Sequence, residues 1–403
     1  MNESLDYAVF LGLDVGKSSH HGCALTPDGR TVFDKPVPQA QADLERLFRK
    51  LLTDHGRVLV IVDQPASIGA LAVAVAQATE GVEVAYLPGL VMRRLAQTHP
   101  GSAKTDARDA YVIAEAARST PHTLRSLEVG EESLADLRVL VGFDTDLAGE
   151  VTRLTNRIQS LLGQIHPALD RVLGPRLQQT VVLELLRRYG GPTGLSKLSH
   201  RQLTAVVTKH AHRNRAQLVE AIENALREQT VLVPGTAGVE AVIPKLVETL
   251  SGLLAQRADA AARIEEMLAA HPLGKVLTSM PGIGVRTAAT ILVEVGDIGR
   301  FPTSGHLAAY AGLAPVTRQS GSSIRGEHRN HGGNKALKRA LFLSSFAALA
   351  DPASRAYYQR KRSEGKPHNA ALVCLSRRRI DVLHAMLRRS QPYQHRQPTP
   401  IAA

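Results

Sequence analysis

Short apolar runs alternate with amphipathic stretches over residues 1–127. The apolar runs are AVFLGL at 8–13, VLVIV at 58–62 and VEVAY at 82–86, and an amphipathic stretch, QADLERLFRKLL, covers 41–52. A short run rich in β-branched residues predicts a buried strand, whereas an amphipathic stretch predicts a helix that covers a sheet. This alternation therefore predicts an α/β domain at the start of the chain.

The pattern changes after Ser133 to the spacing of long helices. One series of positions in steps of three and four is apolar except at Asp144: 137, 140, 144, 147, 151, 154, 158, 161 and 165. A second series, from Val247 to Leu268, is broken by Arg257. Repeats of this length predict a coiled coil. The two series can pair with each other as an antiparallel hairpin, or they can form a contact between two subunits.

The segment between the two series looks helical, and it is basic in places. Residues 208–215 read TKHAHRNR, and the segment is interrupted by YGGPTG and VLVPGTAG. His210 and His212 are too isolated to indicate a metal site. We expect this stretch to be solvated or to face phosphate groups.

Two motifs mark the last third of the chain. PGIG at 281–284 precedes an alanine-rich helix, as in a helix-hairpin-helix motif whose backbone N–H groups approach a phosphate; a plain packing turn is the alternative. Further on, Ser320 stands in a Gly-containing loop between Arg318 and Arg325. A serine can attack a phosphodiester when it is deprotonated and the phosphate charge is neutralised. The residues alone favour the simpler interpretation, a loop whose arginines hold a nucleic-acid backbone.

The composition favours a polyanionic partner. The net charge is +12, and residues 317–396 contain 17 Lys/Arg against 4 Asp/Glu. The two cysteines are far apart in sequence and fit a reduced cytoplasm. Neither a signal peptide nor an apolar run of membrane-spanning length is evident, so we expect a cytoplasmic protein with no membrane partner.

Four aspartates stand where carboxylates are costly without a cation. Asp14 and Asp63 each follow an apolar strand, and Asp106 and Asp109 lie three residues apart at the start of a predicted helix, so that they share a face. Carboxylate oxygens are ligands that Mg²⁺ prefers, and four of them make a two-metal site plausible. The simpler interpretations are a turn residue for Asp14 and a solvated helix start for the last two.

Together, these motifs resemble those of DEDD-type insertion-sequence transposases, a family related to the Piv site-specific invertase. The resemblance rests on LGLDVGKSSH, KTDARDA, MPGIGVRTAATIL, RFPTSGHLAAYAGLAPVTRQSGSS and HGGNKALKRAL. It implies a RuvC-like (RNase H fold) domain at 1–127, a helical coiled-coil region at 128–272, a mainly α transposase domain at 273–390 and a flexible tail at 391–403.

The resemblance also implies roles for individual residues. Asp14, Asp106 and Asp109 match three of the four acidic residues that bind metal, and Asp63 stands where the family usually has Glu. Ser320 matches the serine proposed to attack DNA. The implied partners are donor and target DNA, a structured guide RNA and further copies of the chain as a dimer or tetramer. We expect nucleic acid to contact a set of basic residues: Lys104, Arg318, Arg325, Lys335, Lys338 and Arg339.

Two other functions stay open at this point. One is a nucleic-acid-binding protein that cleaves no strand. The other is a RuvC-like nuclease that uses metal-activated water, in which Ser320 has no catalytic role.

Overall fold

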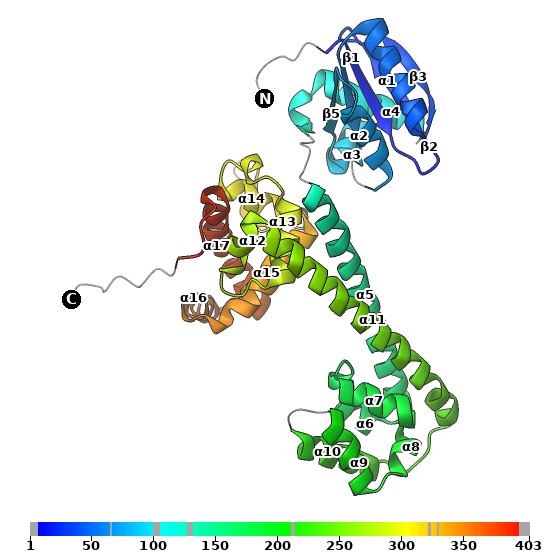
Figure 1. The fold of residues 1–403 in the computed structure, drawn as a ribbon. Helices are drawn as coiled ribbons and strands as arrows, with labels where there is room; N and C mark the ends of the chain where they lie inside the picture. Colours follow the sequence, from blue (N-terminus) through cyan, green and yellow to red (C-terminus); the bar gives the residue numbers. More distant parts are fainter. Residues whose placement is uncertain are drawn as a thin grey trace, which may run out of the picture. The chain divides into compact units, whose positions relative to one another are not determined.

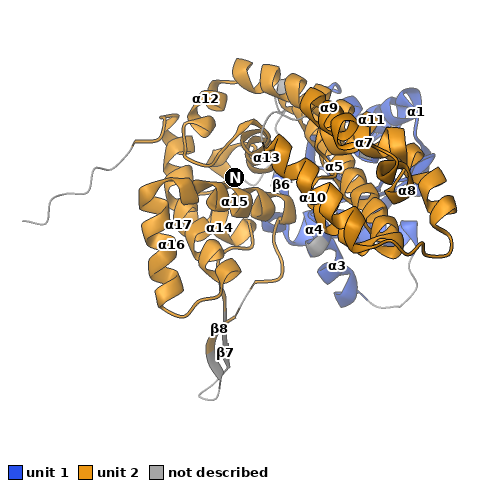
Figure 2. Cartoon of the chain, turned by 90° about the horizontal axis from the view of Figure 1, so that it is seen from below, with its two compact units in different colours: residues 1–130 blue, residues 131–403 orange. Residues whose placement is uncertain are grey.

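The structure is a computed structural model that describes residues 7–64, 67–99, 105–126, 132–210, 214–320, 324–328 and 330–394. The chain divides into two compact units, residues 1–130 and 131–403 (Figures 1 and 2). The first unit is a mixed α/β domain, and the second is helical apart from one β-hairpin. The further division of the second unit at residue 272 stays a prediction.

Unit 1 is built on a six-stranded sheet of order β3-β2-β1-β4-β5-β6. β1, β4 and β5 are parallel to one another, and β2, β3 and β6 run antiparallel to their neighbours. This arrangement is consistent with the RNase H-like fold that the resemblance implies. The strands are β1 (Val9–Asp14), β2 (Ser19–Leu25), β3 (Thr31–Pro38), β4 (Val58–Val62), β5 (Val82–Tyr86) and β6 (Arg125–Ser126).

Helices cover both faces of this sheet. α1 (Gln41–His55) buries Leu44, Leu47, Phe48 and Leu51 on one face, and α2 (Ala70–Gln77) packs beside it. α4 (Asp106–Ser119) covers the other face, together with α3 (Gly89–Thr98), a helix that the sequence pattern did not predict. Side chains of β1 and β4 point alternately to the two faces, as the period of a strand requires.

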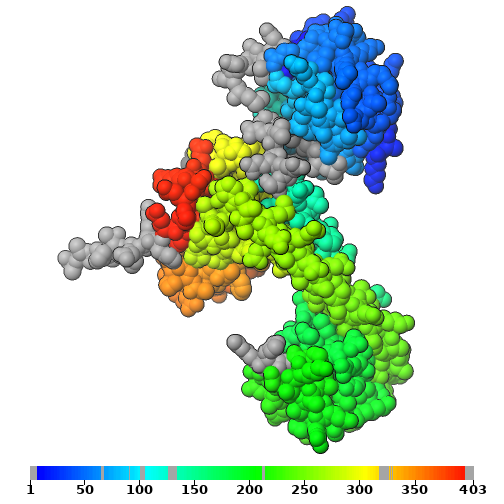
Figure 3. Space-filling model, in the orientation of Figure 1, coloured from blue at the N-terminus to red at the C-terminus, as the bar shows by residue number. Residues whose placement is uncertain are grey.

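Unit 2 is organised around two long helices, α5 (Glu132–Ile165) and α11 (Thr236–Ala270), which pack against each other (Figure 3). Val141 near the start of α5 shares a core with Leu268 near the end of α11, so the pair is antiparallel. Leu147 is buried in the chain's own fold. The structure thus shows the hairpin alternative of the sequence analysis, and substitutions of Leu147 would perturb folding before they reported on self-association.

The two polar residues that interrupt the apolar series form an ion pair. Asp144 of α5 accepts hydrogen bonds from Nε and Nη2 of Arg257 on α11, at 3.1 and 3.4 Å. Nε of Arg286 lies 3.1 Å from the same carboxylate. The Asp144 side chain is only 11% exposed, so both cations compensate a carboxylate that is nearly out of water.

Five helices form one end of unit 2, beyond the start of α11. They enclose an apolar core of their own with parts of α5 and α11. These helices are α6 (Pro167–Leu173), α7 (Thr180–Tyr189), α8 (Pro192–Ser196), α9 (His200–His210) and α10 (Arg215–Glu228).

Five helices enclose a second core at the other end of unit 2, which also carries a hairpin. The helices are α12 (Pro272–Thr278), α13 (Val285–Val295), α14 (Ser304–Tyr310), α15 (Lys335–Ala347) and α17 (His368–Arg389), and α16 (Pro352–Ser363) packs on α17. The hairpin pairs β7 (Val316–Ser320) with β8 (Ile324–His328), where the sequence pattern had indicated only a loop.

Candidate active site

Asp14 and Asp63 lie at the ends of two neighbouring parallel strands. Leu13 of β1 pairs with Val62 of β4, so the next residue of each strand is an aspartate at the same edge of the sheet. Leu13 and Val62 belong to the core under α1. Because side chains alternate along a strand, Asp14 and Asp63 fall on the opposite face, which α4 covers.

A glycine brings α4 close to this edge. A Cβ atom on Gly12 would lie 2.3 Å from the backbone oxygen of Ala110 and 2.5 Å from the nitrogen of Ala114. At the far end of the helix, Nη1 of Arg118 donates to the carbonyl of Pro27, which follows β2. Since β2 is antiparallel to β1, α4 runs antiparallel to β1, and its first turn lies over the end of β1 that carries Asp14.

The first turn of α4 is fixed by its own residues. Thr105 caps the helix by accepting a hydrogen bond from the backbone N–H of Arg108 at 3.3 Å. Nη2 of Arg108 donates to the carbonyls of Ala96 and His99, at 3.2 and 2.9 Å. Arg108 thus ties the helix start to the end of α3. Its position within KTDARDA gave no sign of this role.

Asp63 and Asp109 interact electrostatically. Burial raises the pKa of Asp63, and the negative charge of Asp109 raises it further, against the effect of hydrogen bonds from the backbone of Asp63 and from the side chain and backbone of Gln64. Oδ1 of Asp63 is buried and accepts no hydrogen bond from the residues that the structure describes. Asp109 is half-buried and Asp106 is exposed. Among the described residues, the site therefore brings carboxylates together without a cationic side chain acting on Asp63.

These features fit a hard divalent cation, because the donor atoms are carboxylate oxygens and one of them lacks a partner. The described residues nevertheless hold no group of three His, Cys, Asp or Glu side chains close enough to bind one ion. The structure thus couples Asp63 with Asp109 and sets Asp14 on the same edge. That all four share Mg²⁺ stays a prediction.

The hairpin that carries Ser320 rises from a closely packed base. Gly312 precedes β7, and a Cβ atom there would lie 2.2 Å from the carbonyl oxygen of Gly332, which follows β8. Asn334 begins α15 and binds across this base, with Nδ2 donating to Glu294 Oε2 at 2.5 Å and to the Tyr310 hydroxyl at 3.0 Å. The base holds both ends of the hairpin in place, and Figure 2 shows β7 and β8 extending from the helices of unit 2.

Within the hairpin, the structure describes the backbone register. Ser320 is paired with Ile324, Arg318 with Gly326, and Arg325 with Gln319. The side chains of Ser320, Arg318 and Arg325 lie outside what the structure describes, as does all of Lys104.

The remaining predicted cations lie on α15. Lys335 and Arg339 are exposed. Nζ of Lys338 donates to the carbonyl of Asn330 at 3.0 Å, which links this lysine to the segment after β8.

The PGIG turn has a packed side and an open side. A Cβ atom on Gly282 would lie 2.3 Å from the carbonyl oxygen of Ser344, whereas one on Gly284 would meet no atom within 4 Å. Nη2 of Arg379 donates to the carbonyl of Pro281 at 2.6 Å, and burial lowers the pKa of this arginine to about 10. Close packing therefore explains why position 282 is a glycine. The start of α13 after Gly284 stays accessible.

Comparison with known proteins gives two matches to family models. Residues 11–167 match a model described as "Transposase", and residues 274–359 match one described as "Transposase IS116/IS110/IS902 family". The chain is 56% identical over 402 residues to the 43.6 kDa protein of insertion element IS110 from Streptomyces coelicolor, covering 100% of this chain and 99% of that one. This chain belongs to the IS110 family of transposases.

More distant relatives agree with this assignment. The 42 kDa protein of insertion element IS900 from Mycobacterium paratuberculosis is 33% identical over 98% of this chain and 99% of its own. A pilin gene-inverting protein from Moraxella bovis is 33% identical over 30% of this chain and 38% of its own. The family resemblance in the sequence analysis is thereby confirmed, and this protein is an enzyme of DNA transposition.

The matched regions separate the two halves of the candidate site. All four aspartates fall within the first match, and Ser320 with its flanking arginines falls within the second. The family's type suggests dependence on a divalent metal. Within its described residues, this transposase has no helix that is long and apolar enough to cross a membrane.

Proposed function

We propose that this transposase moves an insertion sequence by cutting and rejoining DNA strands, with Mg²⁺ held by the four aspartates and Ser320 as the nucleophile. The observation that carries the proposal is the buried, unpartnered Oδ1 of Asp63 beside the charge of Asp109, at the sheet edge that Asp14 shares. A buried carboxylate oxygen without a partner is costly, and a bound cation would offset that cost.

The carboxylates would act by holding the cation against the scissile phosphate. Asp63 and Asp109, which already interact, would hold the ion together with Asp14 and Asp106. When bound, Mg²⁺ would neutralise the charge that develops on the phosphate during displacement. Asp63 is shorter than glutamate by one methylene group, so its carboxylate lies closer to the end of β4 than that of a glutamate would.

In the covalent step, the Ser320 oxygen forms a bond to phosphorus, and the bond between phosphorus and the leaving sugar oxygen breaks. The serine proton is lost and the leaving oxygen gains one. Attack by the hydroxyl of another strand then reverses these changes and frees the serine. The energy of the phosphodiester is conserved in the serine ester, so rejoining needs no nucleotide cofactor.

The two halves of this site belong to different compact units, with the aspartates in unit 1 and Ser320 in unit 2. We propose that they come together only in an assembly with DNA, and that the assembly is a dimer or tetramer because recombination exchanges strands at two duplexes. A structured guide RNA would select donor and target DNA. The net charge of +12 supports binding of two polyanions.

A covalent protein–DNA adduct tests the serine's role. Purified transposase is incubated with labelled donor and target DNA, Mg²⁺ and RNA transcribed from the non-coding end of the element, and adducts are separated under denaturing conditions. We expect an adduct that disappears in Ser320→Ala and persists in the matched variants Ser322→Ala and Ser323→Ala. Cleaved ends without any adduct would instead indicate a water-using nuclease, and bound but uncut DNA a binding protein.

Mixing two inactive variants tests whether subunits share the site. Ser320→Ala and Asp106→Ala proteins are assayed for strand exchange separately and in equal mixture. We expect activity to return in the mixture, because one chain then supplies the aspartates and another the serine. Full activity of either variant alone would contradict the composite site.

A further inference from the structure

The five-helix end of unit 2 contains a polar cavity that the proposed reaction does not use. Its volume is about 520 Å³, within the ~300–1,000 Å³ typical of small-molecule sites. It lies between residues 176 and 221, in the stretch that neither family model covers. Part of its wall comes from His210 and Asn214, two residues of the basic stretch for which contact with solvent or phosphate was expected.

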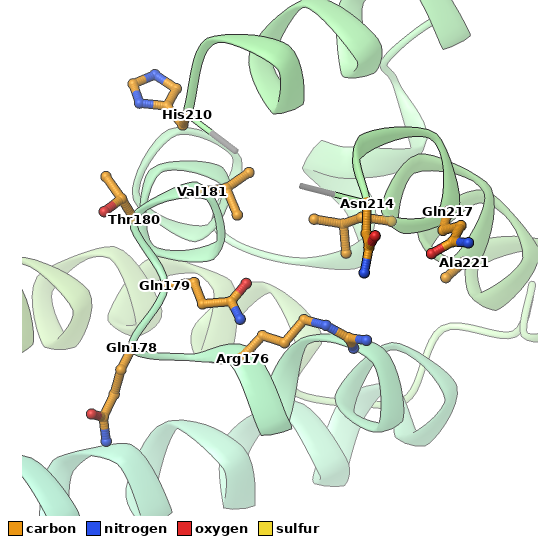
Figure 4. A pocket seen from close by; sticks show the side chains of 10 residues that line it. Arg176, Gln178, Gln179, Thr180, Val181, His210, Asn214, Gln217 and Ala221 are labelled. Carbon is orange, nitrogen blue, oxygen red and sulfur yellow. The ribbon is translucent and has the colours of Figure 1, made fainter. Parts of the chain in front are cut away.

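Three side chains converge in this cavity. Figure 4 shows Arg176, Gln179 and Asn214 directed toward the same space, while His210 and Gln178 turn away from it. Nη1 of Arg176 donates to the carbonyl of Val172 at 2.7 Å, which anchors one side of the guanidinium group and leaves its remaining N–H groups toward the cavity. Among the described residues that line the cavity there is no Asp or Glu, so none of them pairs with Arg176 as an acid.

Two helices begin at the cavity without capping by their own N-cap side chains. Gln179 precedes α7, and Asn214 precedes α10, and neither side chain accepts a hydrogen bond from its helix. Asparagine is among the best capping residues, because its side-chain oxygen can accept a hydrogen bond from the first turn of the helix. Asn214 lacks that bond, adopts a left-handed backbone with φ 55° and directs its amide into the cavity instead.

The chemistry of this lining matches one nucleotide unit. A guanidinium binds phosphate with two parallel hydrogen bonds, and the positive ends of two helices add to the attraction for an anion. Side-chain amides, each both donor and acceptor, match the edges of a nucleobase. Gln217 adds another amide to the wall. A small carboxylate or free phosphate would occupy Arg176 and leave the amides and most of the volume unfilled.

We propose that this cavity is a binding site for a nucleotide, with the phosphate on Arg176 and the base against Gln179 and Asn214. The nucleotide is either free or part of a single strand, and both share the same chemistry. The site is independent of Ser320 and the aspartates, so it stands or falls separately from the proposed reaction.

Photo-crosslinking to the full-length protein tests this site. One arm uses free 4-thiouridine 5′-monophosphate, and the other uses the same nucleotide within a short single strand. After irradiation, labelled peptides are identified by mass spectrometry. We expect label in the peptides that contain residues 176–181 or 214–221. Labelling in the first arm identifies a free nucleotide, and labelling in the second arm alone identifies a nucleotide within a strand.

Matched variants link the label to the cavity. Arg176→Gln should reduce labelling of these peptides about tenfold or more, since hydrogen bonds to charged groups contribute about 1.5–3 kcal/mol. Arg176→Lys keeps the charge and should show an intermediate loss, which separates a binding defect from misfolding. Arg201→Gln makes the same change at an exposed position of α9 outside the cavity lining and should leave labelling unchanged. Labels only elsewhere in the chain, or equal losses in Arg176→Gln and Arg201→Gln, would overturn the proposal.

Discussion

Asp63 in unit 1 and Asp144 in unit 2 are carboxylates largely withdrawn from water in opposite surroundings. Asp144 lies between the guanidinium groups of Arg257 and Arg286. Asp63 has a buried oxygen without a partner among the described residues, and the charge of another acid, Asp109, raises its pKa. The described residues thus pair the carboxylate of Asp144 with two cations and that of Asp63 with none.

The two aspartates differ in the source of the cation that compensates the carboxylate. The Asp144 pair fastens two helices at the place where both apolar series are interrupted, so its cations come from the fold itself. No described residue supplies a cation to the buried oxygen of Asp63, so the proposed cation there would come from solution. The predictions below test this difference.

The largest effect is expected at Asp109. Asp109→Asn removes a charge from the proposed metal site, and a bound metal contributes several kcal/mol of transition-state stabilisation, so strand exchange should fall at least about 100-fold. The matched control is Asp54→Asn, at an exposed position of α1. Strand exchange is measured from single-turnover rates at saturating Mg²⁺. Equal rates in the two variants would remove Asp109 from the site.

In unit 2, removing one of the two arginines beside Asp144 should lower the stability of the fold without lowering the rate of strand exchange. Arg257→Met leaves Asp144 with Arg286 alone, and we expect a loss of about 1–3 kcal/mol because a poorly solvated charge loses a partner. Urea unfolding of the two proteins measures this loss as a difference in the free energy of unfolding. Arg263→Met, at an exposed position of α11, is the matched control.

A double variant sharpens this test. Replacing both partners, as Asp144→Leu with Arg257→Met, should recover most of the loss, since an apolar pair of similar size can replace a buried ion pair. If the double variant is as unstable as Arg257→Met alone, the ion pair does not account for the stability of this part of the hairpin.

The comparison also shows how far the sequence predicts this molecule. The apolar runs locate β1 and β4, and strand alternation places Asp14 and Asp63 at one edge. The heptad pattern identifies α5 and α11, and it marks Asp144 and Arg257 as interruptions. It does not show that these two residues meet, because their register depends on the folded segment between the helices.

Other features escape the sequence because they depend on tertiary packing. Gly12 looks like any glycine in an apolar run, although its missing side chain admits α4. The β7–β8 hairpin lacks alternating apolar residues, so its Ser- and Gly-containing sequence indicates only a loop. The polar cavity joins residues about 40 positions apart, and their convergence follows from how α7 and α10 each pack against α9.

In the absence of metal, Asp63→Asn should have a smaller effect, and it should raise the stability of the fold. Because burial raises the pKa of Asp63, the folded chain binds more protons than the unfolded chain between the ordinary and the raised pKa, and stability falls as pH rises through that window. At neutral pH the charged carboxylate therefore destabilises the fold. Asp63→Asn should raise Tm there, by about 2–4 °C for each kcal/mol recovered, and this gain should vanish below the ordinary pKa.

Adding Mg²⁺ should make the wild-type chain more stable than Asp63→Asn. A ligand that binds only the folded state stabilises it by mass action, so Tm of the wild-type chain should rise with Mg²⁺ concentration and that of Asp63→Asn should rise less. Thermal unfolding of the two proteins, with and without Mg²⁺, measures this crossover. A wild-type chain more stable than Asp63→Asn in the absence of metal would mean that Asp63 already has its cation.

The smallest effect is expected from Asp63→Glu, which restores the residue that the resemblance associates with this position. Charge is unchanged, and the carboxylate moves outward by one methylene group from the end of β4. The longer side chain extends beyond the buried position where Oδ1 lacks a partner, so its pKa should lie closer to the ordinary value of about 4.3. The stabilisation by Mg²⁺ should persist, because both residues offer the same ligand atoms.

Strand exchange should change by less than about tenfold, since less than about 1.4 kcal/mol separates two ligands of equal charge. A loss as large as that of Asp109→Asn would show that the site is built around the shorter side chain, and an unchanged rate without any Mg²⁺ stabilisation would place the metal elsewhere.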